Sequence, residues 1–187
     1  MIKIITAPSE VLSRKAKPVK KIDKKLIGEM EQTLLLAKDP EGVGLAAPQL
    51  GKSLSVFIIK PTPKSPIKVF INPKIVSSIK YRVLSKKSDP IQNTKYKIQN
   101  TRLEGCLSLP NIWGQVKRKP LLSLSFQDKK GGNHTQTFKG FIATIIQHEM
   151  DHLNGVLFTK RVLEQNGELY KSYKDEKGED IFEEIEI

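Results

Sequence analysis

Cysteine and histidine are scarce in this sequence of 187 residues, which has one cysteine, Cys106, and three histidines. A single cysteine excludes an intramolecular disulfide bond, so we expect a reducing, cytoplasmic location. The sequence also lacks an apolar run long enough to cross a bilayer, and its first residues lack the charged and apolar regions of a signal peptide. We therefore expect neither an integral membrane protein nor a disulfide-rich secreted domain.

Acidic residues are outnumbered by basic ones, and the two are unevenly distributed. Lys and Arg number 32 and Asp and Glu 20, which gives a net charge of +12 at neutral pH. Residues 164–187 carry nine acids and three bases, a charge of −6, so the remaining residues carry +18. A basic body favours contact with a polyanion such as RNA, but lysines without interleaved aromatic residues are equally typical of a solvated surface. Both interpretations stay open here.

Apolar periodicity predicts a mixed fold. The predicted helices cover residues 9–16, residues 23–38 with Asp23 as N-cap, and residues 140–153 with Gly155 as C-cap. The predicted strands cover residues 55–60, 67–71, 75–84, 121–127 and 135–139. Strands joined mostly by hairpins, together with two sizeable helices, indicate an α+β fold with antiparallel sheets rather than a doubly wound parallel sheet.

Two segments stand apart from this pattern. Residues 85–103 are polar and basic, and we interpret them as a surface excursion or an extended hairpin; the wider stretch 77–103 has seven bases and one acid. The acidic C-terminal tail, 164–187, alternates apolar and acidic residues near its end, which predicts a β-hairpin. We expect both segments to belong to a single catalytic domain, 1–187.

The sharpest chemical feature is the pentapeptide His148-Glu149-Met150-Asp151-His152. Residues four apart on a helix lie one turn apart on the same face, so both imidazoles can reach one metal ion. Glu149 then lies beside the metal, where it can take a proton from a bound water. The alternative is a helix surface with two solvated histidines, but chance is a poor explanation for this spacing in a chain with so few histidines.

Two further segments could complete a site. Cys106 lies in the segment 104–108, Glu-Gly-Cys-Leu-Ser, and is a candidate third ligand, because a catalytic metal usually has three protein ligands. A structural cysteine or a Cys–His nucleophile is the alternative. The segment 42–49, Gly-Val-Gly-Leu-Ala-Ala-Pro-Gln, lets another backbone approach closely, and the Gln49 amide could stabilise an oxyanion. His134 lies in a turn and is interpreted as solvated.

The three segments, in this order, resemble the motifs of the peptide deformylase family. Those motifs are a Gly-x-Gly-Leu-Ala-Ala-x-Gln loop, a Glu-Gly-Cys-Leu-Ser segment and a Gln-His-Glu-x-Asp-His-Leu helix, and residues 42–49, 104–108 and 147–153 match them. The resemblance extends from about residue 5 to about residue 160. It implies antiparallel sheets packed around a central helix that carries the His-Glu-x-x-His motif.

The resemblance also implies a function. The chain would be a metal-dependent hydrolase, a formyl-L-methionyl peptide amidohydrolase, that removes the N-formyl group from the N-terminal formyl-methionine of newly made polypeptides. Cys106, His148 and His152 would hold one divalent metal ion, Fe²⁺ by the preference of the family, with Ni²⁺, Co²⁺ or Zn²⁺ as substitutes. A metal-bound water would be the nucleophile and Glu149 the general acid/base. Gln49 and the backbone N–H of Leu107 would face the oxyanion.

Substrate binding follows from the same resemblance. The peptide would add as a strand near Val43, Gly44 and Gly105. The methionine side chain would enter an apolar pocket lined by Val43, Phe141 and Ile145, with Thr144 at its edge; ordinary core packing is the alternative role for these side chains. Glu104 and Asp151 would orient the groups around the metal.

The expected partners are formylmethionyl nascent peptides and, through the basic surface, the ribosome. We expect a monomer that does not engage a membrane. The tail differs from the basic helix with which some family members dock on the ribosome, so we do not expect it to serve that role. Two other functions stay open at this point: a zinc peptidase that uses the same helix with a third His or Glu ligand, and a basic RNA-binding module with a structural metal.

Overall fold

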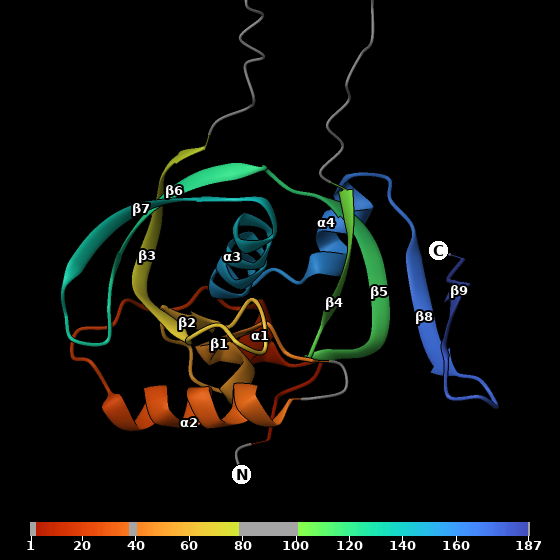
Figure 1. Ribbon diagram of the computed structural model, residues 1–187, viewed down its shortest axis with the longest axis horizontal. Helices are drawn as coiled ribbons and strands as arrows, with labels where there is room; N and C mark the ends of the chain where they lie inside the picture. Colours follow the sequence, from red (N-terminus) through yellow and green to blue (C-terminus); the bar gives the residue numbers. More distant parts are fainter. Residues whose placement is uncertain (1–2, 38–40, 79–100, 187) are drawn as a thin grey trace, which may run out of the picture.

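The computed structural model describes residues 3–37, 41–78 and 101–186 (Figure 1). The helices are α1 (Glu10–Ser13), α2 (Lys24–Leu36), α3 (Gly140–Leu153) and α4 (Phe158–Glu164), with a short 3₁₀ helix, η1 (Ala47–Leu50). The strands are β1 (Gly44–Ala46), β2 (Val56–Ile59), β3 (Lys68–Ser78), β4 (Thr101–Cys106), β5 (Leu109–Lys117), β6 (Leu121–Gln127), β7 (Asn133–Lys139), β8 (Leu169–Lys174) and β9 (Asp180–Glu184). No helix of this described part is long and apolar enough to cross a membrane.

In the described ranges the strands form two sheets with antiparallel pairing. Their orders are β1-β2-β3-β6-β7 and β4-β5-β8-β9, so β1 and β4 each end a sheet. Helix α3 lies between the two sheets, with β3, β6 and β7 on one side and β4 and β5 on the other (Figure 1). The α+β fold with antiparallel sheets around a central motif-bearing helix is therefore confirmed.

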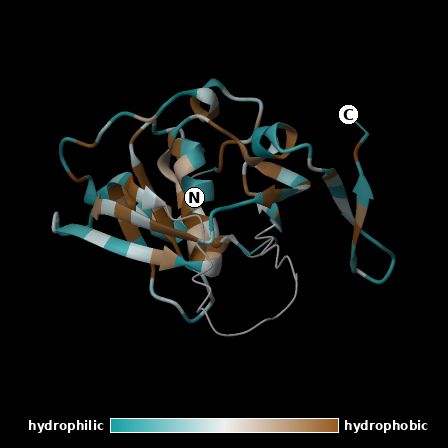
Figure 2. Cartoon of the chain, turned by 90° about the horizontal axis from the view of Figure 1, so that it is seen from above, coloured by the Kyte–Doolittle hydropathy of each residue, from teal (hydrophilic) through white to brown (hydrophobic). Residues whose placement is uncertain are grey.

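Strand β2 shows how the sequence builds two cores from one sheet. Successive side chains of a strand point to opposite faces. Phe57 and Ile59 therefore pack into the cluster around α3, whereas Val56 and Ile58 pack into the cluster around α2. All four are buried, as the continuous apolar run predicts. Figure 2 shows the same division, with hydrophobic residues in the interior strands and helices and hydrophilic residues on the peripheral loops.

The N-cap predicted for α2 is confirmed. The Asp23 carboxylate accepts hydrogen bonds from the N–H groups of Lys25 at 2.9 Å and Leu26 at 3.1 Å, which satisfies two donors that the first helical turn leaves free. The helix ends at Leu36, two residues before the predicted end, and residues 38–40 lie outside the described part.

The prediction of separate strands over 67–71 and 75–84 is wrong within the described residues, because β3 runs without a break through Asn72 and Pro73 to Ser78. Its register with β6 shifts between Ile71 and Lys74, and Asn72 has a φ of 49°. The Asn72 side chain bonds the N–H and C=O of Val19, at 2.8 and 2.9 Å. This bulge accommodates Pro73, which cannot donate to a ladder. Residues 79–84 lie outside the described part.

Strands β4 and β5 and helix α4 were not predicted. The interpretation of 85–103 as an excursion falls mainly on residues 85–100, which lie outside the described residues, while 101–103 belong to β4. Strand β5 contains Pro110, Gly114 and Asn111, the last with a φ of 61°, and these interrupt any period-2 pattern. Helix α4 has only seven residues, too few for a clear helical period.

The acidic tail forms the predicted β-hairpin, from β8 and β9. Strand β8 pairs with β5, so the hairpin extends the sheet that begins with β4. The Trp113 indole N–H donates to Ser172 at 2.9 Å, and its ring meets that of Phe182 edge-on with centroids 5.8 Å apart. The tail is thus packed on the strand that follows the Cys106 segment, and the single-domain assignment stays a prediction.

Helix α3 ends where the chain must pass close to another backbone. Gly155 has a φ of 69°, and a Cβ built there would lie 2.5 Å from the carbonyl oxygen of Ser13. Gly51 also has a positive φ, 78°, but the nearest atoms to its added Cβ are 4.0 Å away. A side chain at Gly51 would therefore meet only backbone strain, whereas a side chain at Gly155 would meet backbone strain and a clash with Ser13.

Replacing Gly155 with Ala should destabilise the protein more than replacing Gly51 with Ala. The Gly51→Ala change carries the left-handed penalty alone, about 1–2 kcal/mol, and Gly155→Ala adds the clash with Ser13, on the order of 1 kcal/mol or more. Denaturant unfolding of both variants measures the difference. Equal free energies of unfolding for the two variants would show that the Ser13 backbone can shift to relieve the clash without destabilising the protein.

Candidate metal centre and active site

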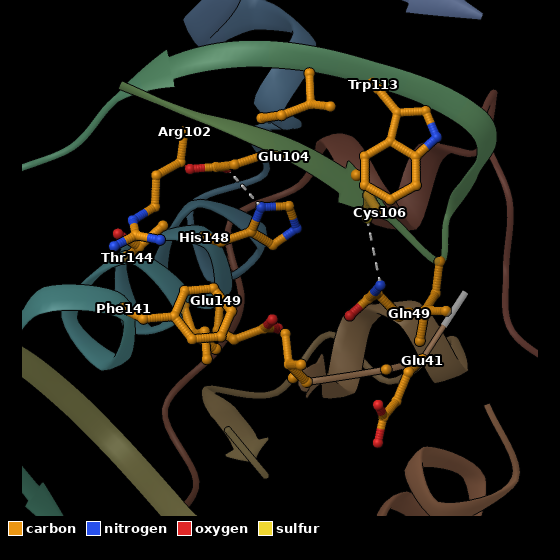
Figure 3. Close-up of a pocket in the computed structure, with 17 residues that line it drawn as sticks. Glu41, Gln49, Arg102, Glu104, Cys106, Trp113, Phe141, Thr144, His148 and Glu149 are labelled. Carbon is orange, nitrogen blue, oxygen red and sulfur yellow. Dashed lines mark hydrogen bonds and ion pairs between the residues drawn. The ribbon is translucent and has the colours of Figure 1, made fainter. Parts of the chain in front are cut away.

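The sequence motifs meet at a pocket between β1, β4 and α3 (Figure 3). Its cavity of about 230 Å³ is several times the share of one water molecule, ~30 Å³, and is large enough for an amino-acid side chain. Among the residues that line it are Gly44, Gln49, Cys106, His148 and Glu149. Ten of the eleven site residues predicted from the sequence line this pocket. The eleventh, His152, is buried, and its Nε2 atom lies 3.1 Å from Cys106 Sγ.

Cys106, His148 and His152 form a compact group of ligand atoms, all within 4.8 Å of one another. Cys106 ends β4, and the two histidines lie one turn apart on α3, as the spacing predicts. Cys106 Sγ lies 3.1 Å from His152 Nε2. Among the described residues, no other group of His, Cys, Asp and Glu could hold a metal ion in this way, and the third His or Glu ligand of a zinc peptidase is not present there.

The electrostatics of this group favour a thiolate. Burial raises the pKa of the Cys106 thiol, but the charge of His152 and hydrogen bonds with both histidines lower it by more, so the pKa lies well below its ordinary value. Burial lowers the pKa of His148, whereas its hydrogen bonds with Cys106 and Glu104 raise it well above its ordinary value. Without an ion, the raised pKa of His148 favours a proton on its imidazole, which balances the negative charge of the thiolate.

A hydrogen bond with Glu104 orients the His148 ring. Its Nδ1 atom lies 3.0 Å from Glu104 Oε2, which leaves Nε2 free to face the pocket. The dashed line between Glu104 and His148 in Figure 3 marks this contact. A carboxylate on the outer nitrogen of a metal-ligating histidine fixes its tautomer and ring orientation.

Arg118 holds Glu104 in place. Its guanidinium donates to both oxygens of Glu104 at 2.8 Å and to Asp151 Oδ2 at 2.6 Å. Arg161, on α4, donates to Asp151 Oδ1 at 2.7 Å. Burial raises the pKa of Glu104, but the hydrogen bonds and charges of Arg118 and His148 lower it to about 2. Glu104 therefore bonds Arg118 and His148, and Asp151 bonds Arg118 and Arg161. The sequence alone did not identify either arginine.

Glu149 occupies a different environment from Glu104. Its side chain is buried, and Oε2 has no hydrogen-bond partner among the described residues. Burial raises its pKa to about 7, because removal from water outweighs the positive charge of the neighbouring histidines. Gly44 makes room for it, since a Cβ at residue 44 would collide with Glu149 Oε1. A carboxyl group with a pKa near neutral is suited to accept a proton and return it.

The amide NH₂ of Gln49 points toward Cys106, one of the candidate metal ligands. Its Oε1 accepts from the Ala46 N–H at 2.8 Å, which fixes the amide orientation. Nε2 then donates to Ser108 Oγ at 3.2 Å and lies 3.6 Å from Cys106 Sγ, the second dashed line in Figure 3. Leu107 follows Cys106 directly and also lines the pocket. The backbone N–H of Ser108 donates to Cys106 Sγ at 3.4 Å, so two N–H donors lie beside the sulfur.

The residues present fit a divalent metal ion. One thiolate and two imidazoles are the sulfur and nitrogen donors that transition metals prefer. Here they come together in one group, with Cys106 and His152 buried and His148 half-buried. The second nitrogen of His148 is bonded to a carboxylate, as expected for a ligand. Glu149 Oε2 lies buried in the same pocket without a partner, where a coordinated water would supply one.

The predicted substrate residues also lie around this pocket. Val43, Gly44, Gly105, Phe141 and Ile145 all line it. Ile145 is buried, whereas Phe141 is 42% exposed and therefore stands at the mouth. Their roles in substrate binding stay predictions.

Other lining residues were not found from the sequence. Trp113 and Arg102 line the pocket because β4 and β5 pair there, and that pairing follows from no motif. The prediction that His134 lies in a turn is wrong, because His134 belongs to β7. It is exposed as expected, and its Nε2 atom lies 2.7 Å from Asp128 Oδ2, away from the pocket.

Comparison with known proteins agrees with this geometry. The model of the family described as polypeptide deformylase matches residues 1–168. A peptide deformylase of Borreliella burgdorferi is 34% identical over 178 residues, which covers 95% of this chain and 98% of that protein. Peptide deformylase 1 of Bacillus cereus is 36% identical over 165 residues and covers 87% and 92%.

Solved structures show the same likeness. The peptide deformylase of Thermotoga maritima aligns with a TM-score of 0.68 and 32% identity, over 86% of this chain and 97% of that one. The enzyme of Synechococcus elongatus, solved in complex with actinonin, aligns with a TM-score of 0.70 and 34% identity, over 88% and 82%. With the motifs joined in one pocket and this similarity over most of its length, the chain belongs to the polypeptide deformylase family.

Proposed function

We propose that the pocket between β1, β4 and α3 is where this chain removes the N-formyl group from formylmethionyl nascent peptides, the reaction of its family. One observation carries the assignment. Cys106, His148 and His152 bring their ligand atoms within 4.8 Å of one another, and the same pocket holds the buried Glu149 carboxyl with an oxygen that has no partner. A set of three metal ligands beside a carboxyl group with a pKa near 7 is suited to hydrolysis.

The ends of the two sheets support strand addition of the substrate. Strand β1 is paired with β2 on one side, and β4 is paired with β5 on one side, so among the described residues each has a second edge without a paired strand. Gly44 and Gly105, on these strands, both line the pocket. We propose that the peptide backbone bonds these edges and that its first side chain enters between Val43, Phe141 and Ile145. Backbone bonds tolerate many sequences, which nascent proteins require.

The proposed chemistry distributes roles among the side chains. Cys106, His148 and His152 would hold the ion, which when bound supplies a Lewis acid that lowers the pKa of water. Glu149 takes a proton from the attacking water and delivers it to the amide nitrogen as the C–N bond breaks. The Gln49 NH₂ and the Leu107 N–H donate to the oxygen of the tetrahedral intermediate. Water and the formyl peptide become formate and a free amino terminus.

Replacing Glu149 with Gln should abolish most activity yet stabilise the metal-free protein. Loss of the proton relay should lower kcat roughly a hundredfold to ten-thousandfold, while metal content stays unchanged. The folded-state pKa of about 7 lies above the value in the unfolded chain. The native carboxyl therefore costs stability as the pH rises from about 4.5 to about 7, so the Gln variant should gain about 1–3 kcal/mol above pH 7 and little near pH 4.5.

Turnover of a formyl-Met peptide and denaturant unfolding at pH 5 and pH 8 measure the two effects. Glu183→Gln, on the exposed strand β9, is the matched control and should change neither. Wild-type turnover by metal-loaded Glu149→Gln would overturn the catalytic role. A stability gain that is the same at pH 5 and pH 8 would contradict the assignment of the burial cost to the carboxylate.

We propose Fe²⁺ as the native ion. The thiolate character of Cys106 supports a transition metal rather than a hard cation. The iron form should lose activity in air as the metal or the thiolate oxidises, and the nickel form should last at least several times longer. Activity half-lives of the two forms, in air and without oxygen, test this. Equal half-lives in air would count against iron as the ion at a redox-sensitive site.

We propose that the chain acts as a monomer and approaches the ribosome through its basic surface. The residues predicted to contribute most lie outside the described part of the chain: Lys80, Arg82, Lys86, Lys87, Lys95 and Lys97. Reversing these six charges should reduce co-sedimentation with ribosomes, and wild-type pelleting should weaken steeply with salt, because phosphate contacts release counterions. Reversal of Lys171 and Lys177 in the tail serves as the control. If reversal of the tail lysines reduces co-sedimentation with ribosomes and reversal of the six other charges does not, the surface is assigned wrongly.

A further inference from the structure

One side chain in the wall of the pocket is polar, buried and without a partner. Thr144 is 3% exposed, and its hydroxyl has no hydrogen-bond partner among the described residues. It lies on α3, three residues after Phe141 and four before His148, so it shares the helix face that lines the pocket. The α3 residues proposed to receive the first substrate side chain, Phe141 and Ile145, flank it. A ligand that brings an acceptor would supply the hydrogen bond that this hydroxyl lacks among the described residues.

A second donor comes from β4. Arg102 lines the same pocket, and its guanidinium lies over the Phe141 ring, 5.5 Å from the centroid. In Figure 3 its side chain descends from β4 toward α3, on the side where Thr144 and Phe141 lie. No carboxylate in the described ranges forms an ion pair with Arg102, and the nearby Glu104 is already bonded by Arg118 and His148. Arg102 is exposed, and within the described ranges its N–H donors have no carboxylate to bond, so a ligand in the pocket can accept from them.

These two residues give the apolar pocket a donor-rich end. Arg102 can only donate, and Thr144 needs an acceptor for its O–H. A thioether sulfur is a weak acceptor, and a norleucine methylene is none. A sulfoxide oxygen is a strong neutral acceptor on a side chain of the same length, and oxidation of methionine places it at the sulfur. Without donors, burial of such an oxygen would be costly.

We propose that Arg102 and Thr144 are specificity-determining residues through which this chain also deformylates peptides that begin with formyl-methionine sulfoxide. The inference rests on the proposed function, because the bond that breaks is the same formyl C–N bond. Water is consumed and formate is released, while the sulfoxide remains intact, so no reductant is needed. The substrate class is thus the oxidised form of the initiator residue.

Steady-state kinetics on three matched peptides test the proposal. The peptides begin with formyl-Met, formyl-Met sulfoxide or formyl-norleucine and are otherwise identical. The wild-type kcat/KM for the sulfoxide should lie within about tenfold of that for Met. Thr144→Val, which is isosteric, and Arg102→Leu, which keeps an alkyl chain near Phe141, should each lower the sulfoxide-to-Met ratio roughly fivefold to twentyfold, since each removes one hydrogen bond to a buried oxygen. The loss should appear mainly in KM if the bond forms equally in the bound substrate.

Two further variants sharpen the result. Thr144→Ser restores the hydroxyl and should restore the ratio. Thr135→Val, on the exposed strand β7, removes a hydroxyl far from the pocket and should leave the ratio unchanged. Ratios in Thr144→Val and Arg102→Leu that match Thr135→Val would overturn the proposal, as would a wild-type sulfoxide rate more than a hundredfold below that for Met. Failure to cleave formyl-Met at all would instead overturn the proposed function, so the two failures are distinguishable.

Discussion

Arg118 is buried between two carboxylates that come from different parts of the fold, Glu104 on β4 and Asp151 on α3. It follows the end of β5, so one guanidinium joins the second sheet to the central helix. Removing one partner of such a buried pair costs about 3–5 kcal/mol. An apolar contact of equal strength could join the same elements, but only the ion pair also leaves a Glu104 oxygen aimed at His148. The orientation of the proposed ligand therefore depends on this interaction.

The two glutamates of the site show how one pocket gives a carboxyl group opposite properties. Glu104 accepts from Arg118 and His148, and its pKa falls to about 2. Glu149 is buried without such donors, and its pKa rises to about 7. Hydrogen-bonded partners make the first a fixed support. Burial without such bonds raises the pKa of the second to the neutral range, where a carboxyl group can exchange a proton. Burial of this carboxyl without a partner for Oε2 costs folding free energy.

The strand order that forms the pocket also leaves strand edges beside it, to which we propose that a peptide backbone binds. Within the described residues β1 and β4 are the first strands of the two sheets, and both contribute residues to the pocket, as does α3. Strand ends offer backbone groups, and the glycines at residues 44 and 105 keep side chains out of the way of neighbours, Glu149 in one case and Trp113 in the other. The side chains that line the pocket come largely from α3 and β4, and we propose that they select the first side chain of the substrate.

The sequence by itself determined the elements that repeat a clear period and indicated the candidate metal ligands. The four-residue spacing of His148 and His152 places both on one helix face, and β2 is buried because its four residues are all apolar. Family resemblance then implied definite roles for Cys106, Glu149 and Gln49, which the residue pattern had offered only as candidates. Tertiary structure alone decided the supports and the pocket walls, because Arg118 and Arg102 meet their partners through strand pairing and helix packing. Such contacts join residues far apart in the chain, and no local pattern in the sequence encodes them.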